Sequence, residues 1–354
     1  MKKRTLTTKA LREFALSRGL DFLGVANIER FAGAPERMHP ASLFPEARSV
    51  IVVGRRIVRG GWRGIEEGTH WPSYTHFCYH GLLNTWFIPL PLYETACFIE
   101  DFGWEAVPHY PGVPETQPPR APLRPGGVPH EVQMAIRIAA TAAGLGEIGW
   151  SKVFLTQRFG PRQRLAAILT DLELEPDPLV EPNSICKLDM ACVRGCPDAI
   201  PHIRDGKTVE IRIEDKTYRW ADVDMGRCTL AYHGGDPRTS PFIPKSLPGY
   251  RFDVTAQHVS EETAYKFCWP MSKGPWRVTG EDPSGYLIQG HAYLSHWGVA
   301  GSYGIGGSRG CMRSCMHYLE QHGHVEQTFK GGPFIHRPRW ALDPSGKPLP
   351  EQKD

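Results

Sequence analysis

The sequence has 354 residues, of which 41 are Lys or Arg and 38 are Asp or Glu, so its formal net charge is only +3. This length allows one large domain or two ordinary ones, and the near balance of charge gives no reason to expect a nucleic-acid partner. The nine cysteines are odd in number and concentrated in the second half, which favours metal ligation in a reducing compartment over a disulfide framework. The N-terminus has no apolar run typical of a secretory signal, and no stretch of 18 apolar residues occurs. We therefore expect a cytoplasmic protein without a membrane-spanning helix.

Helices and strands alternate among the elements predicted for the first half of the chain. Periodic apolar positions predict a helix at 7–18, with Thr7 or Thr8 as its cap. The other expected elements are strands at 22–25, 49–53, 104–108, 153–156 and 164–172, and helices at 92–102 and 131–143. Seven prolines between 111 and 130 predict an extended loop. An acidic, proline-containing stretch at 173–183 is the expected domain boundary.

The most informative motif is C-K-L-D-M-A-C-V-R-G-C-P at 186–197. Bacterial ferredoxins hold iron–sulfur clusters with C-x2-C-x2-C-x3-C-P, in which the fourth Cys ligates the other cluster of a pair. Three of the four positions match, and Asp189 occupies the second. Such a motif requires another cysteine-bearing segment, and the chain offers Cys228 and the C-x3-C pair Cys311 and Cys315. Ser308 stands where a complete second motif would have a Cys.

Other interpretations of these cysteines remain open. Cys311, Cys315 and His317 are close enough in sequence to share a zinc ion, and the cysteines could instead be unrelated buried thiols. Within the iron–sulfur interpretation, Asp189 could ligate iron through oxygen or leave a three-iron cluster. Ser308 is a weaker candidate ligand, and Cys268 could replace it.

Two glycine-containing segments precede the cysteine motif. A-G-L-G-E-I-G carries Gly144, Gly146 and Gly149, which permit positive φ and close approach of the backbone to a ligand. Taken alone, this pattern is equally consistent with a helix C-cap. The second segment, R-F-G-P-R-Q-R, is a predicted turn set by Gly160 and Pro161.

Together these segments resemble one superfamily. A-G-L-G-E-I-G, R-F-G-P-R-Q-R, L-T-D-L-E-L-E-P-D and C-x5-C-x3-C-P are similar to the cobalamin- and iron–sulfur-dependent reductases, which comprise the reductive dehalogenases and the epoxyqueuosine reductases. The likeness covers about residues 130 to 320 and favours the dehalogenase branch. It implies an α/β fold, with a nitroreductase-like corrinoid-binding domain at 1–175, a ferredoxin-like two-cluster domain at 176–325 and a C-terminal tail at 326–354.

The resemblance also implies cofactors and the residues that hold them. Cobalamin and two [4Fe–4S] clusters are expected, with a [3Fe–4S] cluster as the alternative at the position of Asp189. The residues implied to contact the corrinoid are Gly144, Leu145, Gly146, Gly149, Phe159, Gly160, Pro161 and Arg162. The crossover rule assigns Cys186, Asp189, Cys192 and Cys315 to one cluster, and Cys196, Cys228, Ser308 and Cys311 to the other.

The function implied is reductive dehalogenation of a small organohalide. Electrons would come from an external donor such as ferredoxin or flavodoxin, and a proton from His130 or Tyr110, which precede the Gly-rich helix. Two alternatives stay open. One is a tRNA-modifying enzyme similar to epoxyqueuosine reductase, and the other is a non-catalytic iron–sulfur or corrinoid-binding paralogue.

Overall fold

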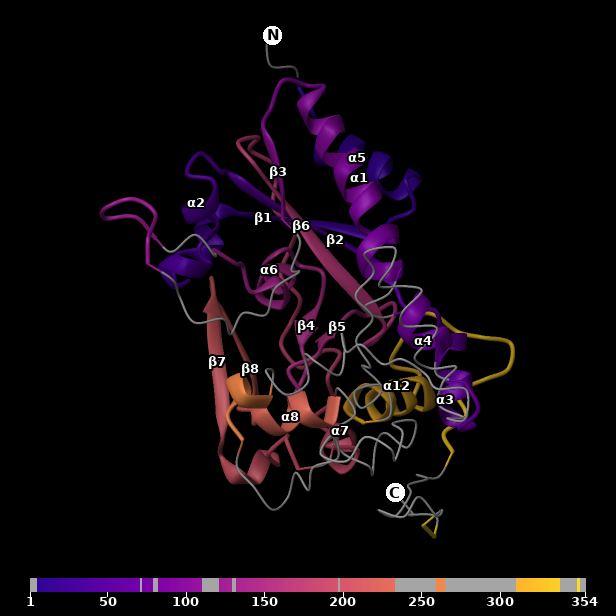
Figure 1. Ribbon diagram of the computed structural model, residues 1–354. Helices are drawn as coiled ribbons and strands as arrows, with labels where there is room; N and C mark the ends of the chain where they lie inside the picture. The colour runs from indigo at the N-terminus through magenta and orange to yellow at the C-terminus, as the bar shows by residue number, and fades with distance from the viewer. Residues whose placement is uncertain are drawn as a thin grey trace, which may run out of the picture.

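The structure is a computed structural model that describes residues 5–70, 72–78, 82–109, 121–128, 132–196, 198–232, 259–264, 310–337 and 349–350. It is a mixed α/β structure (Figure 1). A sheet with helices beside it occupies one end of the molecule in this view, and the helices that carry the cysteines lie toward the other.

A four-stranded antiparallel sheet with the order β1–β2–β6–β3 is the centre of the α/β part. Its strands are β1 (Phe22–Asn27), β2 (Ser49–Arg56), β3 (Ala106–His109) and β6 (Gln163–Thr170). Strand β2 is buried from Ser49 to Gly54 because apolar side chains leave from both of its faces. Residues predicted as strands at 22–25, 49–53, 104–108 and 164–172 thus fall in this sheet, with ends that differ by a few residues.

Both faces of the sheet are covered. Helices α1 (Thr8–Ser17) and α5 (Pro89–Glu100) contribute to the core on one face, where the rings of Phe14 and Phe98 stack at 4.0 Å. The predicted cap of α1 is confirmed, since Thr7 Oγ1 accepts a hydrogen bond from Ala10 N at 3.2 Å. Helix α6 (Ile136–Ala142) packs its alanines on the other face. It begins at Ile136, later than the helix predicted from 131.

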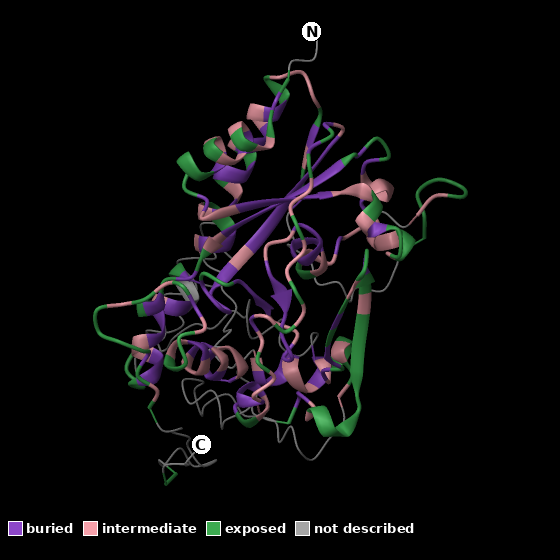
Figure 2. Cartoon of the chain, turned by 180° about the vertical axis from the view of Figure 1, so that it is seen from behind, coloured by how far each residue is buried: buried purple, intermediate pink, exposed green. Residues whose placement is uncertain are grey.

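The remaining elements lie outside this sheet and the three helices that cover it. They are the helices α2 (Pro40–Leu43), α3 (Arg63–Glu66), α4 (Pro72–Phe77), α7 (Ala191–Arg194), α8 (Met225–Tyr232) and α12 (Cys311–Gln321), the strands β4 (Glu147–Ile148), β5 (Phe154–Leu155), β7 (Thr208–Ile213) and β8 (Lys216–Ala221), the 3-10 turns Ile28–Phe31, Glu36–Met38, Arg59–Trp62 and Ile203–Asp205, and the π-helical turn Leu83–Phe87. Strands β7 and β8 form a hairpin whose β7 side is largely exposed (Figure 2).

Two expectations about the ends of the chain can be compared with this fold. Most described residues of the predicted tail, 326–337 and 349–350, are exposed, although Phe334 is 1% exposed and belongs to the same core cluster as Met316, and the tail stays a prediction. Among the described residues, no helix is long and apolar enough to cross a membrane. The division at 175 and 325 stays a prediction.

Candidate iron–sulfur site

The two cysteine-bearing segments meet where helices α7 and α12 pack together. A Cβ atom on Gly195 would lie only 2.2 Å from the Oγ of Ser314, so the helices approach closely because residue 195 has no side chain. Cys192 lies in α7, while Cys311 and Cys315 lie in α12. Figure 1 shows α7 and α12 side by side, although they are more than 100 residues apart in sequence.

The thiols influence one another in a crossed pattern. Burial raises the pKa of Cys315 well above its ordinary value, and Cys186, Cys192 and Asp189 raise it further. Burial also raises the pKa of Cys311, and Cys196 is the next largest cause of this increase. The last cysteine of α12 is thus near the start of the 186–197 motif.

The other end of that motif faces the remaining thiols. Cys228, in α8, raises the pKa of Cys196 and of Cys311, so these three side chains are neighbours. Burial, with a smaller contribution from such neighbours, raises the pKa of Cys192 and that of Cys196 to about 12 each. Six thiols this close together, of which Cys192 is buried and the others are partly buried, repel one another once they ionise, and a bound cation would relieve that repulsion.

Backbone N–H groups point at several of these sulfur atoms. Trp150 N donates to the Sγ of Cys186 at 3.4 Å, and Ala199 N donates to the Sγ of Cys196 at 3.3 Å. All six cysteines are free thiols. Hydrogen bonds to ligand sulfurs are one means by which proteins adjust the potential of an iron–sulfur cluster, so this environment suits thiolates that carry metal.

A buried carboxylate holds the start of the motif. Glu147 is 2% exposed and accepts hydrogen bonds from the backbone N–H groups of Asn183, Ile185 and Cys186 at 2.6, 2.6 and 2.7 Å. Burial raises the pKa of Glu147, and these three bonds oppose the shift. This role of Glu147 was not predicted from the sequence, where the only signal was an acidic residue directly after Gly146.

Asp189 lies beside the thiols but also has a structural role. Its Oδ2 accepts a hydrogen bond from Ala191 N at 2.9 Å at the start of α7, and the Nη2 of Arg194 is 3.8 Å away. Met190, between them, has a positive φ of 60°. The loop therefore turns so that this carboxylate accepts the first N–H of α7 while it lies near Cys186 and Cys192.

The zinc alternative has little geometric support. Within the part of the chain that the structure describes, no three His, Cys, Asp or Glu side chains are arranged to hold a single metal ion. His317 is directed elsewhere, since its Nδ1 lies 3.2 Å from the carbonyl of Phe334 and its ring stacks on His336 at 4.3 Å. Ligands of a multi-iron cluster surround several metal ions, so the same observation does not bear on a cluster.

The Gly-rich loop is engaged by the protein itself. Gly144 has a φ of +67°, and a Cβ atom there would lie 2.3 Å from the carbonyl oxygen of Pro178. A Cβ atom on Gly146 would lie 1.9 Å from the carbonyl oxygen of Leu155. A Cβ atom on Gly149 would meet the Leu155 side chain at 2.8 Å. Internal packing accounts for these glycines, and Leu145 next to them packs in the core.

The R-F-G-P-R turn is likewise buried. Phe159 and Arg162 are each 1% exposed, and Pro161 is buried. The guanidinium of Arg162 donates to the carbonyl of Ile57 at 3.1 Å, and burial lowers its pKa to about 10. Contacts within the protein thus account for the described residues of this turn, and contact of the turn or of the Gly-rich loop with a corrinoid stays a prediction.

Several predicted residues lie outside the described residues. These are Tyr110, His130, Ser308 and Cys268. Their roles stay predictions.

Comparisons with known proteins were made for the sequence and for the fold. No protein-family model matches the chain. A tetrachloroethene reductive dehalogenase of Dehalobacter restrictus is 39% identical over 108 residues, and one from Desulfitobacterium hafniense is 40% identical over a segment of the same length. Each match covers 27% of this chain but only 19% of the relative. The resemblance to reductive dehalogenases predicted from the motifs is thus confirmed over the matched segment, and these relatives are oxidoreductases.

Two solved structures show weaker likeness. A reductive dehalogenase described as suggesting a mechanism for B12-dependent dehalogenation matches 77% of this chain and 38% of its own, with 17% identity and a TM-score of 0.46. Epoxyqueuosine reductase from Bacillus subtilis matches 88% of this chain and 80% of its own, with 16% identity and a TM-score of 0.44. At TM-scores this low, neither likeness assigns a fold.

Proposed function

We propose that this chain is a reductive dehalogenase-like oxidoreductase whose cysteines hold two iron–sulfur clusters. The observation that carries the proposal is the crossed arrangement of the thiols. Cys315 neighbours Cys186 and Cys192, while Cys311 is influenced first by Cys196 and Cys228 and less by Cys192. A two-cluster ferredoxin motif requires such an exchange, because the last cysteine of each motif ligates the cluster of the other.

The ligand assignment proposed from the sequence agrees with this arrangement. Cys186, Asp189, Cys192 and Cys315 would surround one cluster, and Cys196, Cys228 and Cys311 the other, with Ser308 or Cys268 as its remaining ligand. Asp189 is already held by Ala191 N. Its carboxylate is a harder ligand than a thiolate, so we propose that this corner loses iron readily and leaves a three-iron cluster.

The residues around the thiols prepare them for electron transfer. Glu147 fixes the backbone that precedes Cys186, and the N–H groups of Trp150 and Ala199 stabilise negative charge on sulfur. Clusters pass single electrons, whereas cleavage of a carbon–halogen bond consumes two electrons and one proton and releases halide. An external low-potential donor would supply both electrons, and His130 or Tyr110 the proton.

Cobalamin is part of the proposal through the sequence resemblance, as are the nitroreductase-like and ferredoxin-like domains. When bound, a reduced corrinoid would supply the cobalt centre at which the organohalide is reduced. The Gly-rich loop and the R-F-G-P-R turn do not support this part independently, because their described residues contact other parts of the protein. We assign no reaction step to them.

Anaerobic purification tests the proposal. We expect about seven or eight iron atoms per chain, which correspond to two clusters, with matching sulfide and an EPR signal on reduction. The variants Cys192→Ser and Cys196→Ser should each remove one cluster, whereas Cys97→Ser, outside the thiol group, should remove none. Zinc in place of iron would overturn the cluster assignment.

Turnover is tested on the same preparation. After reconstitution with cobalamin, the protein is given a reduced donor and tetrachloroethene, the substrate named for the relatives, and chloride release is measured. If the protein retains its clusters but no cobalt, only the corrinoid part of the proposal is contradicted. Retained cobalt with reduction of an epoxyqueuosine-containing RNA, and no chloride release, would favour the tRNA-modifying alternative.

A further inference from the structure

Helix α12 has two buried faces of different chemistry. Cys311 and Cys315 are four residues apart and share one face, which lies toward the other thiols. Arg313 and Glu320 are seven residues apart and share another face, about half a turn away from the cysteines. Their side chains are only 1% and 5% exposed. Charged side chains are rarely buried to this extent unless they are paired.

The first charged residue of α12 pairs with helix α3. Arg313 donates from its Nε and Nη2 atoms to the carboxylate of Glu66, and the Nη2–Oε2 distance is 3.1 Å. Both side chains are 1% exposed. The backbone N–H of Arg337 also donates to Oε2 of Glu66 at 2.8 Å, and the backbone carbonyl of Arg337 accepts a hydrogen bond from Arg313. The N-terminal half of α12 is therefore tied to the α/β part behind the cysteines.

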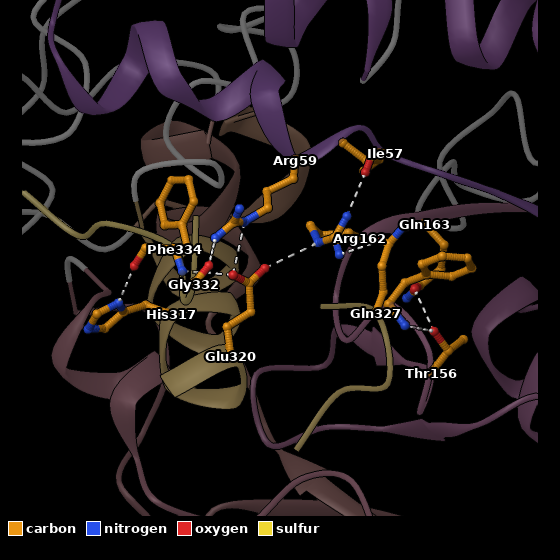
Figure 3. Close-up of polar contacts among 11 residues, drawn as sticks. Ile57, Arg59, Thr156, Arg162, Gln163, His317, Glu320, Gln327, Gly332 and Phe334 are labelled. Carbon is orange, nitrogen blue, oxygen red and sulfur yellow. Dashed lines mark hydrogen bonds and ion pairs between the residues drawn. The ribbon is translucent and has the colours of Figure 1, made fainter. Parts of the chain in front are cut away.

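The second charged residue lies between two arginines from the α/β part (Figure 3). Oε2 of Glu320 forms an ion pair with the Nε of Arg59 at 3.0 Å, and its Oε1 lies 3.8 Å from the Nε of Arg162. It also accepts a hydrogen bond from Phe334 N at 2.8 Å. Arg59 donates in turn to the carbonyl of Gly332 at 2.7 Å. One carboxylate thus joins α12, the segment after it and two separate parts of the α/β region.

The R-F-G-P-R turn contacts the C-terminal end of α12. A Cβ atom on Gly160 would lie 3.1 Å from the Leu319 side chain, so the turn is in contact with the helix. Gln327 N donates to the carbonyl of Arg158 at 3.1 Å, and the side chain of Gln327 accepts from Arg162 at 2.8 Å. The turn therefore holds both the helix and the strand-like segment that follows it.

We propose that Arg59, Glu66 and Arg162 are positioning residues, which bind the face of α12 opposite its cysteines. In this way they fix the positions of Cys311 and Cys315 relative to the thiols of the 186–197 motif. The R-F-G-P-R turn then serves the cluster region. This inference rests on the proposed function only where it says that these two cysteines ligate clusters. The contacts to α12 stand without it.

Hydrogen exchange of the full-length protein without metal tests the clamp alone. Glu320→Gln keeps the size of the side chain and removes the charge shared by the two arginines. We expect amides 313–321 to exchange at least about tenfold faster, while amides of α1 and β2 keep their rates. Glu326→Gln removes an exposed carboxylate from the same segment and should change nothing. If the amides of α12 exchange in Glu320→Gln at the rate of the wild-type protein, the inference is overturned.

A second pair of variants keeps the test decisive if Glu320→Gln does not fold. Arg162→Gln removes the charge, whereas Arg162→Lys retains it. We expect α12 to exchange faster in Arg162→Gln and to recover at least half of its protection in Arg162→Lys. Equal exchange in wild type and Arg162→Gln would count against the clamp.

The reconstituted protein tests positioning. Variants with a loosened α12 should show an altered EPR signal and lose iron faster than Glu326→Gln under the same chelator. Unchanged EPR and iron loss, despite faster exchange, would show that the clamp does not position the cysteines. A wild-type protein that takes up no iron would refute the proposed function, while the exchange arm would still decide whether the clamp exists.

Discussion

Replacement of Glu147 by Gln tests how the cysteine motif is held. The carboxylate is 2% exposed and accepts three backbone N–H groups, two at Oε1 and one at Oε2. Gln has nearly the same shape but offers one acceptor oxygen and one NH2 donor. With its oxygen at the Oε1 position, it keeps the bonds from Ile185 and Cys186. Its NH2 group then faces the N–H of Asn183, so that bond is lost.

The size of the effect follows from these contacts. A hydrogen bond to a charged group contributes about 1.5–3 kcal/mol, and a neutral one about 1 kcal/mol. Losing one charged bond and weakening two others would cost about 3–5 kcal/mol. The neutral amide avoids the burial of charge that raises the pKa of Glu147, which offsets part of this cost. We expect a net loss of about 2 kcal/mol in the free energy of unfolding.

Urea unfolding of the metal-free chain measures this loss, and hydrogen exchange of residues 183–189 reports whether the motif itself has loosened. Glu181→Gln is the matched control, because that carboxylate lies in the same segment but its side chain is 74% exposed. It should shift stability by less than about 0.5 kcal/mol. Equal urea midpoints and equal exchange in the two variants would refute the role assigned to Glu147.

Three further predictions concern other parts of the site and fold. Asp189→Ala should destabilise the chain by about 1 kcal/mol through loss of the bond to Ala191 N, and Asp189→Cys should convert a labile cluster into a stable four-iron cluster. EPR and iron counts distinguish these outcomes, and spectra of Asp189→Cys identical to wild type would exclude Asp189 as a ligand. Gly146→Val should lower the free energy of unfolding by about 3 kcal/mol even without any corrinoid, because its Cβ would lie 1.9 Å from a carbonyl oxygen. Urea unfolding checks this, and a wild-type midpoint would contradict the packing role of Gly146. Burial lowers the pKa of His109, so the unfolded chain takes up this proton before the folded chain does. The stability that His109 contributes is therefore complete above about pH 6.5 and decreases as the pH falls. Urea midpoints between about pH 7.5 and 5.5 should fall less steeply in His109→Gln than in wild type, and parallel slopes would rule this out.

Local patterns in the sequence were sufficient for α1, α5 and the strands of the main sheet, and they led to the prediction that the thiols hold clusters. The apolar periodicity and the cap at Thr7 predicted α1 within a residue at each end, because both signals act between neighbours in the chain. The apolar run at 49–53 likewise predicted β2. The spacing from Cys186 to Cys196 indicated clusters, since ligands on one short loop are close together in any fold. Helix α6 was predicted too long. The prediction included residues 132–135, which are not helical in the structure.

Tertiary structure decided which residues serve the site and how. Contact of Gly146 and Arg162 with a cofactor stays a prediction, and the fold adds that one packs against Leu155 while the other binds Glu320 and Ile57. Nothing in the local sequence reveals that Glu147 holds a loop 36 residues away. Pairing of buried charges and close approach of backbones depend on segments distant in sequence, whose positions are set by the packing of the whole chain. The sequence therefore determines the kind of ligands available, and only the folded chain determines which side chains hold them in place.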